Sequence, residues 1–297
     1  PSIIISHNVD TKTIDCKCCR DNVAPTGHWF CRNIKGFIPP ILEELLSERY
    51  RIKKEMKEAT GLMKQSLFGQ QWALKILANS FYGYLGYPRS RWYSKESAES
   101  ITAWGRQYIG DVIEEAGHEG YLVVYGDTDS LFVSSSEKDE GKARAFLMHV
   151  NETLPKTMEL EMEGYFRRGV FVTKKKYALI DEEGVITTKG LEVVRRDWTG
   201  IAKKTQQRVL EKILLDGDVE GAKALVQQVT RDIKENNVPV KDLVIDTQLT
   251  MGLNQYKTEG PHVAIARLLK DRGEDIKMGS IISYLVLKGS GRIRDKA

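Results

Sequence analysis

The sequence predicts an α+β fold, and three observations support this prediction. Two short apolar stretches flank a tight Gly/Asp turn within residues 121–133, which is typical of a β-hairpin. Residues 160–190 have a strand-like pattern, whereas residues 39–116 and the region after residue 198 have helical periodicity. Helices and strands therefore occupy separate stretches of the chain, as in α+β proteins.

The first 82 residues are expected to contain one strand and two helices. Residues 1–38 begin with the apolar run PSIII and continue with a polar, Cys-rich stretch, so we predict a strand followed by an insertion. Pro39-Pro40 predicts a helix start and Thr60-Gly61 its end. A second helix from about Met63 to Tyr82 would form an αα-hairpin with the first. Its expected packing residues are Leu67, Leu74, Ile76 and Leu77.

The remaining elements follow in order. A third helix is predicted from about Lys95 to Ala116, ahead of the 121–133 hairpin, and residues 140–151 also have a helical pattern. Turns are expected within the 160–190 region at Gly164 and at residues 181–184. The pattern changes after residues 195–198, which predicts a domain boundary. The helices expected beyond it cover about 200–215, 218–236 and 261–272.

Length and composition indicate a soluble globular protein. With 297 residues, 41% of them hydrophobic and 29% charged, the chain is long enough for two or three packed units. No apolar run approaches the ~20 residues of a membrane span, and no signal peptide is recognisable. The chain starts at Pro1 rather than Met and ends in GRIRDKA, so we expect both ends to be cuts in a longer protein. The net charge of +4 does not by itself indicate nucleic-acid binding.

All four cysteines fall in the first 31 residues. They are Cys16, Cys18, Cys19 and Cys31, and His28 lies beside them. The ligand types resemble those of a zinc knuckle, but the spacing is not one of the standard CxxC pairs. A disulfide from Cys18 or Cys19 to Cys31 is a second interpretation, and free thiols in a reducing cytosol are a third. The sequence does not favour the metal site over the other two.

Two carboxylates lie two residues apart in the predicted hairpin. Side chains alternate along a strand, so Asp127 and Asp129 can lean to the same side. Close carboxylates repel each other unless a hard cation such as Mg²⁺ lies between them. Asp is also an ordinary turn residue, so the pair alone leaves a turn and a metal site equally open. An EF-hand loop is excluded, because its sixth and twelfth positions would be Phe132 and Lys138.

The second helix carries a possible phosphate-binding face. Gln71, Lys75, Asn79 and Tyr82 share one side of this helix, and a Lys followed by an amide and an aromatic ring suits a triphosphate and a base. Arg49 and Lys53 are one turn apart on the first helix, so an antiparallel hairpin would direct both groups at one polyanion. The alternative is a salt-bridged helix surface. Its acidic partners would be Glu48 and Glu55. No GxxxxGK[ST] phosphate loop is present.

Four motifs in order carry a resemblance to a known family. They are PSII at residues 1–4, KxxxNSxYG at residues 75–83, YGDTDS at residues 125–130 and KKKY at residues 174–177. In order, spacing and identity they resemble the family B DNA polymerases, and most closely the archaeal replicative type. The resemblance extends over essentially all 297 residues. A reverse transcriptase is a poorer match, because its two catalytic Asp residues are contiguous.

The resemblance implies the right-hand fold of polymerases. Residues 1–38, with the Cys-rich insertion, and residues 87–193 would form a palm built on an antiparallel sheet. Residues 39–86 would form two-helix fingers, and residues 194–297 would form an incomplete, largely helical thumb. PSII resembles the end of the family's first polymerase motif, Asp-x-x-Ser-Leu-Tyr-Pro-Ser-Ile. The Asp of that motif, and the Tyr that excludes ribonucleotides, would both precede Pro1. We therefore expect the isolated fragment to be inactive, and nothing in it supports proofreading.

Residue roles also follow from the resemblance. Asp129 would bind a catalytic pair of Mg²⁺ ions, and Asp127 would have a weaker or indirect role. The residues implied to bind the incoming dNTP are Arg49, Lys53, Lys75, Asn79, Tyr82 and Gly83. The residues implied to contact primer-template DNA are Tyr125, Gly126, Thr128, Lys174, Lys175, Tyr177, Arg195, Arg196, Lys203 and Lys204.

The implied activity is transfer of a nucleotide from dNTP to a primer 3′-hydroxyl by a two-Mg²⁺ mechanism. The implied partners are primer-template DNA, dNTP and a sliding clamp reached through a C-terminal region, with no membrane. The implied location is cytoplasmic and nucleoid-associated. Two other functions stay open: a non-catalytic, primer-template-binding part of a split polymerase that needs a partner chain, and a palm enzyme that acts on RNA.

Overall fold

The αα-hairpin expected near the N-terminus is present in the computed structural model, which describes residues 1–135, 139–289 and 292. Helix α2 (Ile38–Glu58) and helix α3 (Gly61–Leu85) are joined by two residues. Arg49 Nε donates to Gln71 Oε1 at 3.4 Å. Since these two residues are about equally far from the break, the helices run antiparallel, as predicted.

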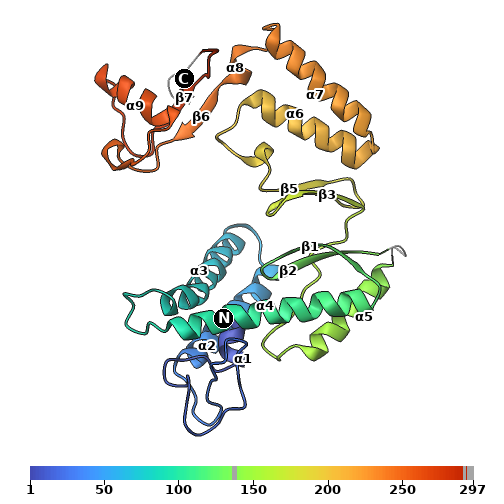
Figure 1. The fold of residues 1–297 in the computed structure, drawn as a ribbon, viewed down its shortest axis with the longest axis vertical. Coiled ribbons are helices and arrows are strands. Elements are labelled where there is room, and N and C mark those ends of the chain that lie inside the picture. The colour runs from blue at the N-terminus through green and yellow to red at the C-terminus, as the bar shows by residue number, and fades with distance from the viewer. Residues whose placement is uncertain (136–138, 290–291, 293–297) are drawn as a thin grey trace. The chain divides into compact units, whose positions relative to one another are not determined.

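The chain divides into two units, Pro1–Glu163 and Gly164–Ala297 (Figure 1). The first unit holds the hairpin of α2 and α3 together with a long helix, two short ones and a two-stranded sheet. These further elements are α1 (Ser2–Ser6), α4 (Lys95–His118), β1 (Leu122–Asp127), β2 (Ser130–Ser134) and α5 (Glu140–Thr153).

The strand predicted at the N-terminus is wrong, because Ser2–Ser6 forms the helix α1. Its run of three Ile residues favours a strand by propensity. In the structure the Ile5 amide donates to the Pro1 carbonyl at 3.0 Å, and Ile4 and Ile5 are buried. They belong to one hydrophobic cluster with residues of α2, α3 and α4. Tertiary packing therefore overrides the local preference.

The packing face predicted for α3 is partly wrong. Leu67 is buried, but Ile76 is 57% exposed and Leu77 is 49% exposed. The buried face instead contains Gln71 and two residues nearer the C-terminal end, Ala78 and Leu85. The polar Gln71 is buried because it receives the hydrogen bond from Arg49 on α2. Several apolar side chains of α3 are left exposed as a result.

A buried carboxylate closes the Cys-rich loop (residues 11–36) onto the start of α2. Asp10 is 0% exposed, and its Oδ2 accepts hydrogen bonds from the amides of Phe37 and Ile38, both at 2.8 Å. Its Oδ1 accepts from the Lys12 amide at 2.8 Å. The first amides of a helix have no partner inside it, and the helix dipole favours a negative charge there. A Cβ at Gly36 would lie 2.6 Å from the Asp10 Cβ, so this approach requires glycine.

The second unit combines small antiparallel sheets with helices. A three-stranded sheet is formed by β3 (Arg168–Thr173), β4 (Lys176–Ile180) and β5 (Ile186–Lys189) in that order. No strand is present at residues 160–167, where the sequence pattern begins. The helical elements are η1 (Glu192–Val194), α6 (Gly200–Glu211), the π-helical turn η2 (Lys212–Asp216), α7 (Val219–Lys234), α8 (Val240–Leu243), η3 (Leu253–Gln255) and α9 (Pro261–Asp271).

A second sheet in this unit was not predicted from the sequence. β6 (Ile245–Gln248) pairs antiparallel with β7 (Ile281–Tyr284), and Ile282 packs with Leu249 and Ala266 of α9. The three-stranded sheet has a separate core, which it shares with α6 and η2 through Leu210 and Leu214. The boundary between the two units lies after Glu163, within residues 87–193, which were expected to form part of the palm. The palm, fingers and thumb ranges stay a prediction.

Candidate functional site

The predicted carboxylate hairpin forms, and its turn has an unusual backbone. β1 pairs antiparallel with β2, and Asp127 lies opposite Ser130. The Asp129 amide donates to the Asp127 carbonyl at 2.7 Å, and Thr128 between them has a φ of +60°. This bond with a positive central φ is the arrangement of a classic γ-turn, which is rare and strained. For a β-branched residue such as Thr128 a positive φ is an outlier, and such strain concentrates at functional sites.

The two carboxylates of this turn differ in their surroundings. Asp129 is exposed, whereas Asp127 is half-buried and its Oδ1 accepts a hydrogen bond from the Thr128 hydroxyl at 3.1 Å. The strand before them is supported by α4, where Ile113 comes within 3.7 Å of the position that a Gly126 Cβ would occupy. Two carboxylates supply the oxygen ligands that Mg²⁺ prefers, so the donor set fits the ion.

A complete metal site needs more donors than this hairpin offers. Within the described ranges, groups of three or more His, Cys, Asp or Glu side chains with converging ligand atoms include the cysteine cluster but not Asp127 or Asp129. Two carboxylates cannot hold two Mg²⁺ ions by themselves, because each ion keeps six oxygen ligands and relies on carboxylates for its charge. A further carboxylate must come from outside this hairpin if two ions bind.

The residues predicted to bind dNTP lie together on the hairpin of α2 and α3. Arg49 contacts Gln71 directly, Lys53 is one turn from Arg49 and Lys75 is one turn from Gln71 in the opposite direction along the hairpin. The three cations therefore fall within about 12 Å of helix axis. Lys75 is exposed and its Nζ lies 5.2 Å from the centre of the Trp72 ring.

The glutamates near Arg49 and Lys53 form ion pairs with Arg51 instead. Arg51 pairs with Glu48 and with Glu55, both at 2.5 Å, and the hydrogen bond from Arg51 lowers the pKa of Glu48 below its usual value. Among the residues that the structure describes, neither Arg49 nor Lys53 has an ion-pair partner. The salt-bridged surface considered from the sequence therefore exists, but it is built on Arg51.

Asn79, Tyr82 and Gly83 continue the same helix toward its C-terminal end. All three are exposed, and 41% of the Tyr82 side chain is accessible to solvent. A Cβ at Gly83 would meet nothing within 4 Å, so this position offers open backbone next to an aromatic ring. An exposed aromatic ring is a group on which a base can stack.

The KKKY motif lies in the second unit, in the turn between β3 and β4. Lys174 and Lys175 form the turn, with φ +64° at Lys175, and the Tyr177 ring lies 5.6 Å from the Phe171 ring. A Cβ at Gly190 would lie 2.0 Å from the Lys175 carbonyl oxygen, so the backbone passes there only because residue 190 is glycine. The turn is thereby fixed against the end of β5.

Lys176 of the same motif has a structural role that the sequence did not indicate. Its Nζ donates to Glu192 Oε1, and Gln206 Nε2 of α6 donates to Glu192 Oε2 at 2.7 Å. The Gln206 Oε1 in turn accepts from the Val193 amide at 2.7 Å. These bonds tie β4 to α6. The hydrogen bond from Lys176, followed by that from Gln206, lowers the pKa of Glu192 to about 2.

Acid is expected to weaken this connection. Because the folded-state pKa of Glu192 lies below its ordinary value near 4.5, its contribution to stability is full above that value and is lost as the pH falls toward 2. We expect the Glu192→Gln variant to show a weaker dependence of melting temperature on pH between 5 and 2.5, measured by circular dichroism. Glu182→Gln, in the exposed turn after β4, is the control and should match the wild type. Identical pH profiles for Glu192→Gln and wild type would contradict this role.

The four cations that were predicted to lie in a thumb differ in their partners. Arg195 forms a two-point pair with Asp197, at 3.0 and 2.8 Å, and Lys204 pairs with Asp242 at 2.8 Å. Arg196 is exposed and Lys203 is half-buried, and the part of the chain that is described shows no ion pair for either. Arg196 and Lys203 are therefore better placed than the other two to meet phosphates.

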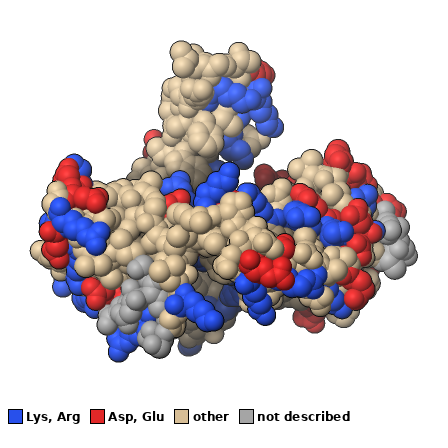
Figure 2. All heavy atoms as spheres, turned by 90° about the horizontal axis from the view of Figure 1, so that it is seen from above, with Lys and Arg blue, Asp and Glu red and all other residues tan. Residues whose placement is uncertain are grey.

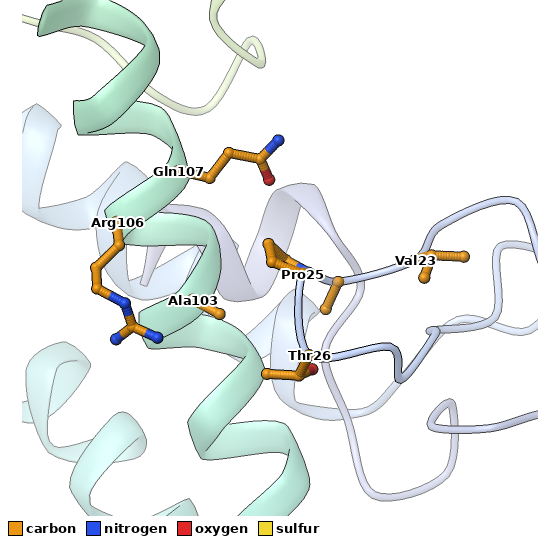
Figure 3. A pocket seen from close by; sticks show the side chains of 7 residues that line it. Val23, Pro25, Thr26, Ala103, Arg106 and Gln107 are labelled. Carbon is orange, nitrogen blue, oxygen red and sulfur yellow. The ribbon is translucent and has the colours of Figure 1, made fainter.

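The surface has no single basic face in the view of Figure 2, where Lys and Arg are interspersed with Asp and Glu. An open recess of about 500 Å³ lies between the Cys-rich loop and α4 (Figure 3). Its lining includes Pro25, Thr26, Ala103, Arg106 and Gln107. None of the predicted site residues lines this recess.

The cysteines predicted as a group come together, and His28 does not join them. The Sγ atoms of Cys16, Cys18, Cys19 and Cys31 all lie within 4.8 Å of one another. His28 Nδ1 instead pairs with Asp15 Oδ2 at 2.8 Å.

Comparisons with known proteins agree with the predicted family. The family model described as DNA polymerase family B matches residues 1–297. The DNA polymerases of Thermococcus sp. (strain 9oN-7) and Thermococcus gorgonarius are each 53% identical to this chain over 305 residues. Both alignments cover 100% of this chain but only 39% and 40% of the relatives, so the chain spans about two fifths of their length.

A solved structure gives the same result. The structure of the family B DNA polymerase from the hyperthermophilic archaeon Pyrobaculum calidifontis is similar to this chain with a TM-score of 0.68 and 34% sequence identity. The similarity covers 100% of this chain and 39% of that one. Among the described residues, no helix combines the length and the apolar character that crossing a membrane requires.

Proposed function

This chain belongs to DNA polymerase family B, and from that membership we propose that it forms the core of a template-directed DNA polymerase. The observation that carries the proposal is the distribution of charge on α2 and α3. Arg49, Lys53 and Lys75 have no ion-pair partners among the described residues, whereas the neighbouring Arg51 has two. Unpaired cations within about 12 Å of helix axis suit the triphosphate of a dNTP.

Each predicted residue then has a task in nucleotide transfer. The primer 3′-hydroxyl attacks the α-phosphate, and Arg49, Lys53 and Lys75 offset the charge that builds on the departing pyrophosphate. Tyr82 presents its ring to the new base pair, beside the open backbone of Gly83.

The turn carboxylates have the second task. Asp129, the more exposed of the two, would hold magnesium directly, and Asp127 would orient the turn and lie at the edge of the site. Two Mg²⁺ ions, when bound, stabilise the attacking and leaving oxygens of the displacement. Their binding requires the further carboxylate that this hairpin lacks, which we assign to another part of the longer polymerase.

Duplex DNA is the proposed macromolecular partner. Tyr125, Gly126 and Thr128 would lie against the primer terminus, and the KKKY turn and the thumb cations would contact phosphates without reading sequence. We extend the proposal to a sliding clamp, bound through a C-terminal region of the longer polymerase, and to a location on the chromosome in the cytoplasm. These two extensions follow from the family.

The nucleotide-binding role is tested by kinetics of the polymerase that contains this chain. We expect Lys75→Ala to raise the apparent KM for dNTP by about 10- to 100-fold, the effect of losing a charged hydrogen bond to phosphate. Lys75→Arg should retain most of the affinity. The matched control is Arg51→Ala, which removes a cation that Glu48 and Glu55 already neutralise and should leave this KM unchanged. An unchanged KM in Lys75→Ala, or an equal rise in Arg51→Ala, would contradict the assignment.

A second function is favoured by the incomplete metal site. The chain would then be a primer-template-binding part of a split polymerase, which becomes active only with a partner that supplies the missing carboxylate. A primer-extension assay of this chain, with and without a separate N-terminal piece of a related polymerase, distinguishes the two. Extension by this chain alone would refute the claim that its metal site is incomplete.

A further inference from the structure

The four cysteine sulfur atoms converge on one point of the Cys-rich loop. Sγ–Sγ distances are 3.4 Å for Cys16–Cys19, 3.4 Å for Cys18–Cys31 and 3.7 Å for Cys19–Cys31. With zinc–sulfur bonds of about 2.3 Å, the sulfur atoms of a tetrahedral site lie about 3.8 Å apart. A disulfide brings sulfur atoms together in pairs, whereas here all four are mutually close. This is the arrangement that a single tetrahedral ion requires.

We propose that Cys16, Cys18, Cys19 and Cys31 bind one Zn²⁺ ion as a closed structural site, a role separate from nucleotide transfer. Four protein thiolates leave no open position on the ion, so the site has no place for a substrate.

The scaffold around the thiols holds them from two sides. Cys31 is 0% exposed, its amide donates to the Thr13 carbonyl at 2.8 Å and its carbonyl accepts from Asn8 Nδ2 at 2.6 Å. On the other arm, Trp29 Nε1 donates to the Cys16 carbonyl at 2.9 Å. The backbone at Cys31 and at Cys16 is therefore held by hydrogen bonds that do not use the sulfur atoms.

The segment that carries three of the ligands has no apolar side chains to hold it in place. Residues 15–21 read DCKCCRD, and all of them are exposed or half-buried. Asp15 also has a positive φ of +49°. Short polar segments of this kind usually need a metal or a disulfide to define them. The convergence of the three thiols in this segment is thus explained by a shared ligand.

The charge around the site suits four thiolates and one divalent ion, which together carry two negative charges. Lys17, Arg20 and Arg32 each follow a cysteine directly in the sequence. Arg20 lies 4.6 Å from the centre of the ring of Trp29, whose Nε1 donates to the Cys16 carbonyl. Such outer contacts orient the ligands and stabilise the charge of a metal centre.

Zinc is the ion that fits best. Four thiolates are soft ligands that select zinc or iron–sulfur clusters over magnesium or calcium. All four sulfur atoms lie within 4.8 Å of one another, which leaves room for one ion but not for a cluster of two or four irons.

The test uses the full chain, purified without oxygen and in the presence of a reducing agent. We expect elemental analysis to find one zinc per chain. Co²⁺, offered as a probe in place of zinc, should give the sulfur-to-cobalt charge-transfer band and the strong visible bands of a tetrahedral thiolate site. The four thiols should react slowly with a thiol reagent while zinc is bound, and quickly after a chelator removes it.

Two single substitutions separate the ligands from their neighbour. Cys18→Ser changes the most exposed of the four cysteines, so the variant should fold, and we expect its zinc affinity to fall by about 100-fold or more. His28→Ala is the matched control, because His28 lies in the same loop but pairs with Asp15. It should retain one zinc per chain and an unchanged cobalt spectrum.

Several results would overturn the proposal. Four rapidly reacting thiols in the presence of equimolar Zn²⁺ would exclude the site, and so would disulfides found in a chain purified without oxygen. Iron in place of zinc would refute the identity of the ion. A loss of zinc in His28→Ala equal to that in Cys18→Ser would refute the ligand set. None of these measurements depends on polymerase activity, so the zinc site and the proposed function fail separately.

Discussion

Replacing Asp129 by Asn in the polymerase that contains this chain is expected to lower nucleotide incorporation by about 10³-fold or more. Primer-template affinity should stay near that of the wild type, because the substitution keeps the size of the side chain and leaves the cations that we propose to contact DNA intact. The measurements are single-turnover incorporation for the rate and fluorescence anisotropy with labelled DNA for the affinity.

The geometry of the turn explains why this effect should be so large. Asp129 is exposed at the tip of the turn. The hydrogen bond from its amide to the Asp127 carbonyl fixes the position of the backbone from which its side chain extends. An amide at this position removes one negative charge from the proposed magnesium site and leaves the backbone unchanged. Asp127→Asn should have a smaller effect, since Asp127 is half-buried and hydrogen-bonded to the Thr128 hydroxyl.

A control of the same kind is available in the second unit. Asp181 also lies in a β-hairpin turn, where its Oδ1 accepts a hydrogen bond from the Val185 amide at 2.7 Å. Asn can accept the same bond, so Asp181→Asn should incorporate nucleotide at the wild-type rate. Wild-type turnover by Asp129→Asn would refute the catalytic assignment of the hairpin.

Among the substitutions considered, Asp10→Ala is expected to lower the free energy of unfolding most, by about 3 kcal/mol or more. The substitution removes three hydrogen bonds to backbone amides, two of them at the start of α2, and leaves those buried donors without partners. Asp10→Asn should cost less, because one amide oxygen can still accept while the amide nitrogen faces donors. The measurement is a urea titration of the full chain, followed by Trp fluorescence.

Asp21→Ala is the matched control for this prediction. Asp21 lies in the Cys-rich loop that Asp10 closes and is exposed, so its loss should change the urea midpoint only slightly. An equal shift for Asp21→Ala and Asp10→Ala would show that the loop tolerates no change of charge, and would contradict the specific role of Asp10.

The sequence predicted the elements whose signals are local. The helices α2, α3 and α4 and the hairpin of β1 and β2 appear within a few residues of the expected bounds, because periodicity and turn residues are properties of neighbouring positions. The family resemblance is confirmed over the whole chain. The roles of the individual site residues remain predictions.

The interactions that sequence reasoning missed all join distant residues. Asp10 caps α2 from far along the chain, and Lys176 meets Glu192 because β4 pairs with β5, which leads into η1. β6 and β7 are short and separated by α9, so neither has enough pattern to predict its pairing. The four cysteines were grouped from the sequence, but their spacing is not that of a known metal motif, so the sequence could not separate a metal site from a disulfide or free thiols. The one signal that was available for Asp10 was its place before a polar loop, which does not identify its partner.

Because Asp10 anchors the start of α2, the hairpin of α2 and α3 is held at its base, and a small rotation there moves its outer part much further. Ile38 and Leu85, at the two chain ends of the hairpin, are buried in the same core, while Leu62 near its tip is 84% exposed. At 1.5 Å per residue, Arg49 and Lys53 stand about 17 and 23 Å along the helix from Ile38. A tilt of about 10° at the base would carry Lys53 through about 4 Å, more than a hydrogen-bond length. A small adjustment at a rigid support thus suffices to make or break a phosphate contact.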